Sequence, residues 1–100
     1  MSEATSDYKT NKNPLPVIDY DKYLAGTKAQ VEINRYKNAH KDPDKPIELW
    51  GLILGRPLGN LFAAIENHNY DGMETYIFQV SAVLAEIYAI SREAQNEQKK

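Results

Sequence analysis

The order of polar and apolar residues divides the chain into a polar start and a longer amphipathic part. Residues 1–13 hold almost nothing that a core would bury, which predicts a disordered tail. Pro14 and Pro16 follow, and proline restricts both itself and the residue before it to extended backbone. We therefore interpret residues 14–18 as an extended arm that lies against the core or against a partner.

A first helix is predicted within residues 19–40, where apolar positions are sparse. Thr27 and Gln30 match a capping box, in which a threonine begins a helix and a glutamine follows three residues later. Gly26 directly before them suggests a break. We expect the helix to begin near Thr27, with residues 19–25 forming a separate turn.

The second helix is predicted over residues 47–67, after a loop rich in Asp and Pro at 41–46. Its apolar stripe is interrupted by Gly55 and Pro57. A proline inside a helix removes one hydrogen bond and clashes with the preceding turn. We expect a kink here, or two helices that meet near Gly55.

The third helix has the most regular pattern, and a capping box at Asp71 and Glu74 predicts its start. Apolar residues recur at three- and four-residue steps, which is typical of an amphipathic helix: Met73, Tyr76, Ile77, Val80, Val83, Leu84 and Ile87. A second stripe lies about 180° away at 100° per residue: Phe78, Ala82, Ala85 and Ala89. A small three-helix monomer rarely covers both sides of a helix, so we interpret the second stripe as a subunit contact, with Trp50 and Tyr88 as further interface candidates.

These elements predict an all-α fold in a single domain over residues 14–94, with a frayed C-terminus at 95–100. The domain is a small helical bundle that we expect to be completed by dimerisation into a four-helix unit. With 100 residues in the chain, the packed part buries a modest share of its surface. Oligomerisation is a common remedy for so small a core.

Composition narrows the class of function. The net charge of −2 offers no broad basic surface for a phosphate backbone, so nucleic acid is a poor candidate partner. The absence of cysteine excludes disulfides and thiolate metal sites. No apolar run approaches the roughly 18 residues of a membrane span. We expect a cytoplasmic protein with no membrane contact.

No catalytic pattern stands out. His40 and His68 lie in expected loops among polar residues, where solvated histidines are usual. The two glycines of 54–59 match no phosphate-binding motif. The acids near the helical core are explained by capping or by exposure. We therefore predict no catalytic residue, no metal site and no cofactor. The seven tyrosines are a supply of aromatic anchors for a partner surface.

One stretch carries a family resemblance. Residues 54–66 read LGRPLGNLFAAIE, and 79–87, after a short polar turn and the start of the third helix, read QVSAVLAEI. The stretch 47–94 resembles the all-α nucleoside triphosphate pyrophosphohydrolase superfamily, the MazG-like proteins, which read E-E-x-G-E-L-x-x-A-I and then E-L-x-D-V-L at these places. The resemblance implies a helical fold that pairs across a dimer and a Mg²⁺-dependent site for nucleotides.

The acids that bind Mg²⁺ in that family are replaced here. Their positions correspond to Arg56, Pro57 and Asn60 on the first motif, and to Gln79 and Ala82 on the second. Mg²⁺ needs anionic oxygen ligands, which these side chains do not supply. The set Arg56, Asn60, Gln79 and Glu86 is then either a vestigial pocket or a site that binds an anion or nucleotide directly.

Three functions stay open at this point. The first is a non-catalytic MazG-like module, a pseudoenzyme that regulates, scaffolds or inhibits a protein partner, in the manner of some phage or mobile-element proteins. The second is an active pyrophosphohydrolase with relocated ligands, which requires acids among Glu48, Glu66, Glu74 or Glu86 to converge, within one chain or across subunits. The third is a helical adaptor unrelated to MazG.

Overall fold

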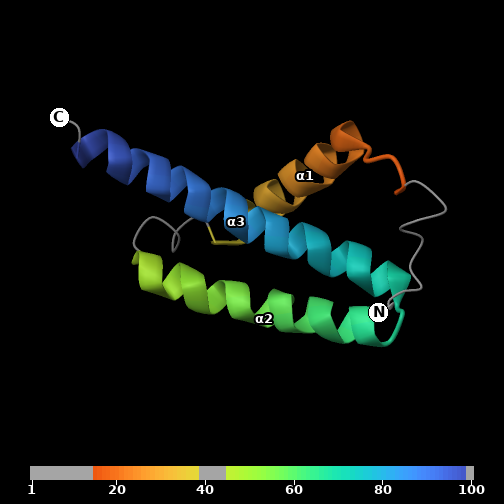
Figure 1. Cartoon of the computed structure of the whole chain (residues 1–100). Coiled ribbons are helices and arrows are strands. Elements are labelled where there is room, and N and C mark those ends of the chain that lie inside the picture. Colours follow the sequence, from red (N-terminus) through yellow and green to blue (C-terminus); the bar gives the residue numbers. More distant parts are fainter. Residues whose placement is uncertain (1–14, 39–44, 99–100) are drawn as a thin grey trace.

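The computed structural model describes residues 15–38 and 45–98, and these form three helices and no strand (Figure 1). The helices are α1, Tyr20–Asn38, α2, Ile47–Glu66, and α3, Tyr70–Gln98. The prediction of an all-α bundle is confirmed. The expected tail at 1–13 and the loop that holds His40 lie outside the described residues.

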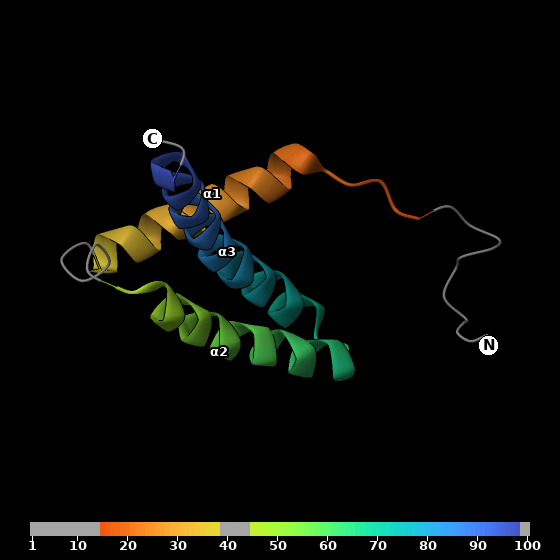
Figure 2. The same cartoon turned by 60° about the vertical axis from the view of Figure 1, so that its left-hand side comes forward.

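Helix α3 is the centre of the arrangement. It packs against α2 in an antiparallel hairpin and against α1 on another face (Figures 1 and 2). Among the described residues, the buried hydrophobic side chains are Trp50, Ala64, Ala82 and Val83. The core is therefore a thin seam along α3 rather than a centre surrounded by helices.

Helix α1 begins earlier than expected. The backbone N–H of Lys22 donates to Asp19 Oδ1 at 3.0 Å, so Asp19 caps the helix. The helix then passes through Gly26 and Thr27 without a break, and the predicted capping box at Thr27 is wrong. Gly26 marks a close approach instead, because a Cβ added there would lie 2.4 Å from Cζ of Phe78 on α3.

Helix α2 is one continuous helix through Pro57, so the prediction of two helices meeting near Gly55 is wrong. Its three buried residues, Trp50, Pro57 and Ala64, are spaced seven residues apart, which places them on one face. That face packs on α3. Packing along the whole length of this stripe compensates for the single hydrogen bond that the proline removes.

Helix α3 is capped by Asn69 and not by the predicted box at Asp71 and Glu74. The N–H of Gly72 donates to Asn69 Oδ1 at 3.0 Å, and the N–H of Met73 donates to the Asn69 carbonyl at 2.8 Å. Asp71 lies in the first turn, where its charge suits the helix dipole. The helix extends to Gln98, beyond the expected end of the domain at residue 94.

Before α1, residues 15–19 have no regular secondary structure, and the segment leads away from the three helices (Figure 2). Its apolar side chains are exposed, with Val17 at 96%. This is the segment that the sequence assigned to the extended arm. Of the helices in the described ranges, none combines the length and the hydropathy that a membrane crossing requires.

Candidate functional site

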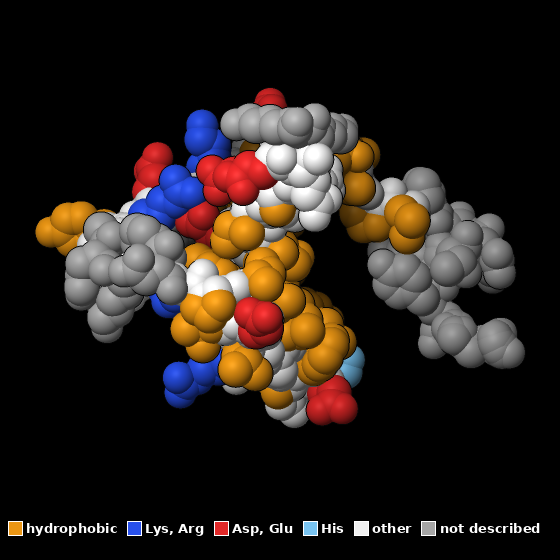
Figure 3. Space-filling view, turned by 90° about the vertical axis from the view of Figure 1, so that its left-hand side faces the viewer, with side chains coloured by type: hydrophobic (Ala, Val, Ile, Leu, Met, Phe, Trp, Pro, Cys, Tyr) orange, Lys and Arg blue, Asp and Glu red, His pale blue; other side chains and the backbone are white. Residues whose placement is uncertain are grey.

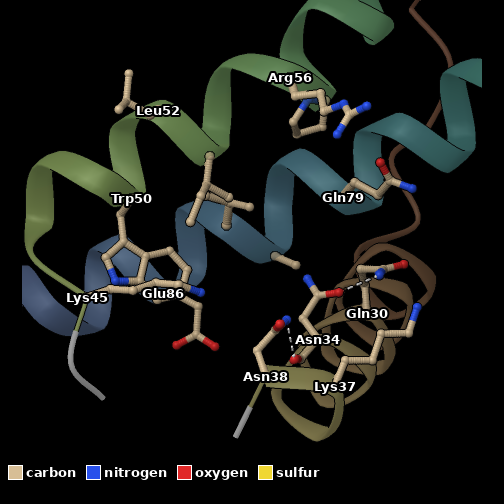
Figure 4. Close-up of a pocket in the computed structure, with 14 residues that line it drawn as sticks. Gln30, Asn34, Lys37, Asn38, Lys45, Trp50, Leu52, Arg56, Gln79 and Glu86 are labelled. Atoms are coloured by element: carbon tan, nitrogen blue, oxygen red, sulfur yellow. Dashed lines mark hydrogen bonds between the residues drawn. The ribbon is translucent and has the colours of Figure 1, made fainter. Parts of the chain in front are cut away.

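A pocket of about 560 Å³ lies where the second half of α1, the first half of α2 and the middle of α3 meet (Figure 4). Arg56 of α2 and Gln79 of α3 lie at one end of it, and Lys45 and Trp50 lie at the other. Helix α1 forms a polar side of the pocket with these residues: Gln30, Asn34, Lys37 and Asn38.

Neutral amides organise the α1 side of the pocket. Gln30 Nε2 donates to Asn34 Oδ1 at 2.9 Å, and Asn38 Nδ2 donates to the Asn34 carbonyl at 3.0 Å. These i,i+4 bonds fix the amides along one face of the helix. The pocket therefore presents ordered hydrogen-bonding groups that carry no charge.

Cations outnumber acids around the pocket. Lys37, Lys45 and Arg56 line it, and Glu86 is the acid that lines it. The Lys45 ammonium lies 5.1 Å from the centroid of the Trp50 ring, a cation–π geometry. The local charge is thus positive although the whole chain carries −2.

Glu86 is already engaged by Arg35. Arg35 Nε donates to Glu86 Oε2 and Nη2 donates to Oε1, both at 2.7 Å, in a bidentate pair that joins α1 to α3. The Glu86 side chain is 12% exposed and that of Arg35 is 62% exposed. The guanidinium neutralises the carboxylate, so Glu86 removes little of the positive charge from the pocket.

A second contact fixes α1 across α3 near Gly26. The Tyr23 hydroxyl and the Ser81 hydroxyl share a hydrogen bond. The rings of Tyr23 and Phe78 lie 6.1 Å apart between centroids. Together with the ion pair of Arg35 and Glu86, this contact holds the α1 side of the pocket in place.

The structure brings together three of the four pocket residues expected from the sequence. Arg56, Gln79 and Glu86 line the pocket, whereas Asn60 is exposed and outside it. Asn60 follows Arg56 by one turn, and the pocket ends before that turn. The prediction that Asn60 belongs to the site is therefore wrong.

The interface candidates divide into two groups. Phe78 packs against Gly26, and Ala82 and Trp50 are buried within the chain at 1% and 6% exposure. The expectation that Ala82 and Trp50 form a subunit contact is wrong, because both are buried within the single chain, whereas Phe78 is half-buried. Ala85, Ala89 and Tyr88 are exposed, and their part in an interface stays a prediction.

Sequence reasoning missed the α1 side of the pocket as well as Lys45 and the position of Trp50. A signal for α1 was present. Neutral polar residues recur at three- and four-residue steps, which is the spacing of one helix face: Thr27, Gln30, Asn34 and Asn38. Charged residues are usual on a solvated helix face, so a stripe of neutral polar residues indicates a polar contact or a ligand.

Acidic side chains do not converge in the described ranges. No group of three or more His, Asp or Glu residues there has the arrangement that a metal ion needs. Within one chain, the acids proposed as relocated ligands therefore form no such site: Glu48, Glu66, Glu74 and Glu86.

A second surface is apolar and lies on the α2–α3 hairpin. Six large hydrophobic side chains, each at least about one-third exposed, define what we call the hairpin face: Ile47, Phe62, Ile65, Ile77, Leu84 and Tyr88. Arg56 and Gln79 lie on the other flank of the contact between α2 and α3. By helical geometry the six residues therefore share the side of the hairpin that is turned away from the pocket. Figure 3 shows hydrophobic side chains gathered in the lower part of the view.

Comparisons with protein-family models, with curated proteins and with solved structures give no match for this chain.

Proposed function

We propose that this chain is a non-catalytic, MazG-like helical module that acts through protein–protein contacts, and that its first contact is with a second copy of itself. The observation that carries the proposal is the hairpin face. Two copies that meet through this face form a four-helix unit, with α2 and α3 contributed by each.

The exposed apolar side chains of the hairpin face favour its being covered by helices of a partner rather than left in contact with water. Phe62 is 57% exposed, Leu84 is 47% exposed and Tyr88 is 67% exposed. Apolar patches of this kind on small proteins mark interaction sites. Because the face includes residues of both helices, a two-fold axis across it brings α2 and α3 of one copy against those of the other.

The energetics are of the right size for a dimer. Burying the exposed half of such a side chain contributes roughly 1 kcal/mol. Six residues on each of two copies then contribute on the order of 10 kcal/mol, which exceeds the lower estimates of the cost of association, about 4 kcal/mol. The small core gives the same indication, because so few buried side chains rarely stabilise a domain alone.

The non-catalytic part of the proposal rests on the chemistry of the residues. Where the MazG-like pattern has acids, this chain has Arg56, Pro57, Asn60, Gln79 and Ala82. Arg56 would repel Mg²⁺, and the others carry no charge. These five positions supply no group that would position a divalent cation and activate water.

The test is the mass of the chain in solution. We expect light scattering to give a dimer for the unaltered chain at about 100 μM, and a monomer for Phe62→Glu and for Leu84→Glu, because each buries a charge in the interface. Tyr36→Glu is the matched control, since Tyr36 is 89% exposed on α1, outside the hairpin face. A monomeric unaltered chain, or a dimer that survives both hairpin variants, contradicts the proposal.

Catalysis has its own test. Nucleoside triphosphates are incubated with the chain and Mg²⁺, and pyrophosphate release is measured. We expect none above the background without protein. Turnover that Glu86→Gln abolishes would overturn the non-catalytic assignment.

A further inference from the structure

We infer that the pocket between α1, α2 and α3 binds a small organic polyanion, with phosphate or carboxylate groups, directly and without a metal ion. This site is complete in a single chain. It is therefore independent of the proposed dimer, whose hairpin face lies on the other side of α2 and α3.

The charges of the pocket select an anion. Among the described residues, neither Lys37 nor Arg56 has an ion-pair partner, and Arg35 engages Glu86 from outside. The lining groups thus present one cation from α1, Lys37, and one from α2, Arg56. Arginine binds phosphate or carboxylate with two parallel hydrogen bonds, and lysine adds a point charge.

The shape of the pocket favours a ligand longer than a single inorganic ion. Trp50 and Arg56 are six residues apart on α2, which is about 9 Å along the helix axis. Lys45 lies at the Trp50 end and Lys37 lies on the α1 side (Figure 4). A volume of about 560 Å³ is that of a pocket for an organic molecule of moderate size.

Two further observations point to a polar ligand. The side-chain amides of Gln30, Asn34 and Gln79 can form hydrogen bonds with hydroxyl or carbonyl groups in the uncharged part of the ligand, between its anionic groups. The indole N–H of Trp50 is buried and has no acceptor among the described residues. Buried donors are rarely left unpaired, and an anionic oxygen at this end of the pocket supplies the missing acceptor.

A nucleic acid backbone fits these observations less well. The pocket gathers Lys37, Lys45 and Arg56 in one place, whereas the chain as a whole carries −2, which disfavours an extended phosphate backbone. A small polyanion needs only the charges that line the pocket.

The experiment uses the full chain in a buffer freed of metal ions by a chelating resin, constant ionic strength and two probes, sodium pyrophosphate and sodium citrate. Binding is measured by thermal shift and by calorimetric titration. We expect a saturable rise of Tm with at least one probe. Response to pyrophosphate alone assigns phosphate chemistry, response to citrate alone assigns carboxylate chemistry, and response to both supports the shared polyanion site.

Variants locate the binding. We expect Arg56→Gln and Lys37→Gln to weaken the Kd on the order of tenfold each, which is the effect of one charge-assisted hydrogen bond. Arg92→Gln and Lys28→Gln are the matched controls, because both residues are exposed and do not line the pocket. Circular dichroism checks that all four variants fold.

Three outcomes overturn the inference. The first is no saturable response to either probe, and the second is equal weakening by the pocket variants and their controls. The third is binding that appears only when Mg²⁺ is added to the metal-free buffer.

Discussion

Replacing Gly26 by alanine adds a methyl group at the point where α1 crosses α3. The new Cβ would lie 2.4, 2.5 and 2.8 Å from three ring atoms of Phe78, namely Cζ, Cε1 and Cε2. Ordinary carbon contacts are about 3.5–4.0 Å, so the ring must move by about 1 Å or more. The ring of Phe78 also contacts the ring of Tyr23. Its movement therefore disturbs the contact with Gly26 and the contact with Tyr23.

The size of the effect follows from two opposing terms. Overpacking of this kind costs about 1–3 kcal/mol. Alanine in place of glycine inside a helix contributes about 1 kcal/mol in the other direction. We therefore expect Gly26→Ala to lower the free energy of unfolding by about 1 kcal/mol, measured by urea titration with circular dichroism at fixed protein concentration.

A second substitution reverses the sign. Leucine lacks all three of the ring atoms that the new methyl group meets. In a Phe78→Leu background we therefore expect Gly26→Ala to raise stability by about 1 kcal/mol, which gives a coupling energy of about 2 kcal/mol. Gly59→Ala is the control, since no atom lies within 4 Å of its Cβ position, and we expect it to stabilise both backgrounds. If Gly26→Ala stabilises the unaltered chain as much as it does the Phe78→Leu chain, α1 does not lie on Phe78 as described.

Three further predictions concern the helices. Pro57→Ala restores the hydrogen bond to the Ile53 carbonyl but removes buried ring atoms. We expect the free energy of unfolding to rise by about 2 kcal/mol, measured from the midpoint of urea unfolding, and a lower free energy of unfolding would contradict this. Asn69→Ala removes the cap of α3 and should cost about 1 kcal/mol in thermal unfolding, while Asn69→Asp should cost less. A double-mutant cycle of Arg35→Gln and Glu86→Gln should give a coupling of about 0.5–1 kcal/mol that falls with added salt, because Arg35 is largely exposed; zero coupling at low salt would refute the ion pair.

The helical fold was predictable from the sequence because hydrophobic periodicity marks α2 and α3 directly. The prediction of 47–67 for the second helix agrees with Ile47–Glu66. The errors in the continuity of α1 and α2 lie at glycine and proline, which local rules treat as breaks. At Gly26 the reason for the glycine is Phe78, 52 positions later in the chain. No local pattern distinguishes a glycine that ends a helix from one that admits a neighbouring ring.

The pocket was predictable only in part, for a related reason. Arg56, Gln79 and Glu86 were expected there from the resemblance to the MazG-like pattern. The contribution of α1 depends on how that helix crosses α3, which is set by contacts between distant residues such as Tyr23 and Ser81. Lys45 and Trp50 line the pocket because of the same tertiary arrangement.

The polar character of the α1 contact has a consequence for how the molecule opens. No residue of α1 is buried, and its contact with α3 includes the half-buried polar residues Thr27, Gln30 and Asn34. Releasing this helix exposes little apolar surface, so its backbone amides should exchange with deuterium at a lower free energy than those of α2 and α3. Because the pocket needs α1 and the hairpin face does not, undocking of α1 would dismantle the pocket and leave self-association intact. A ligand in the pocket would then slow the hydrogen exchange of the α1 amides more than that of the α2 and α3 amides. The fraction of molecules with α1 docked would therefore rise with the ligand concentration.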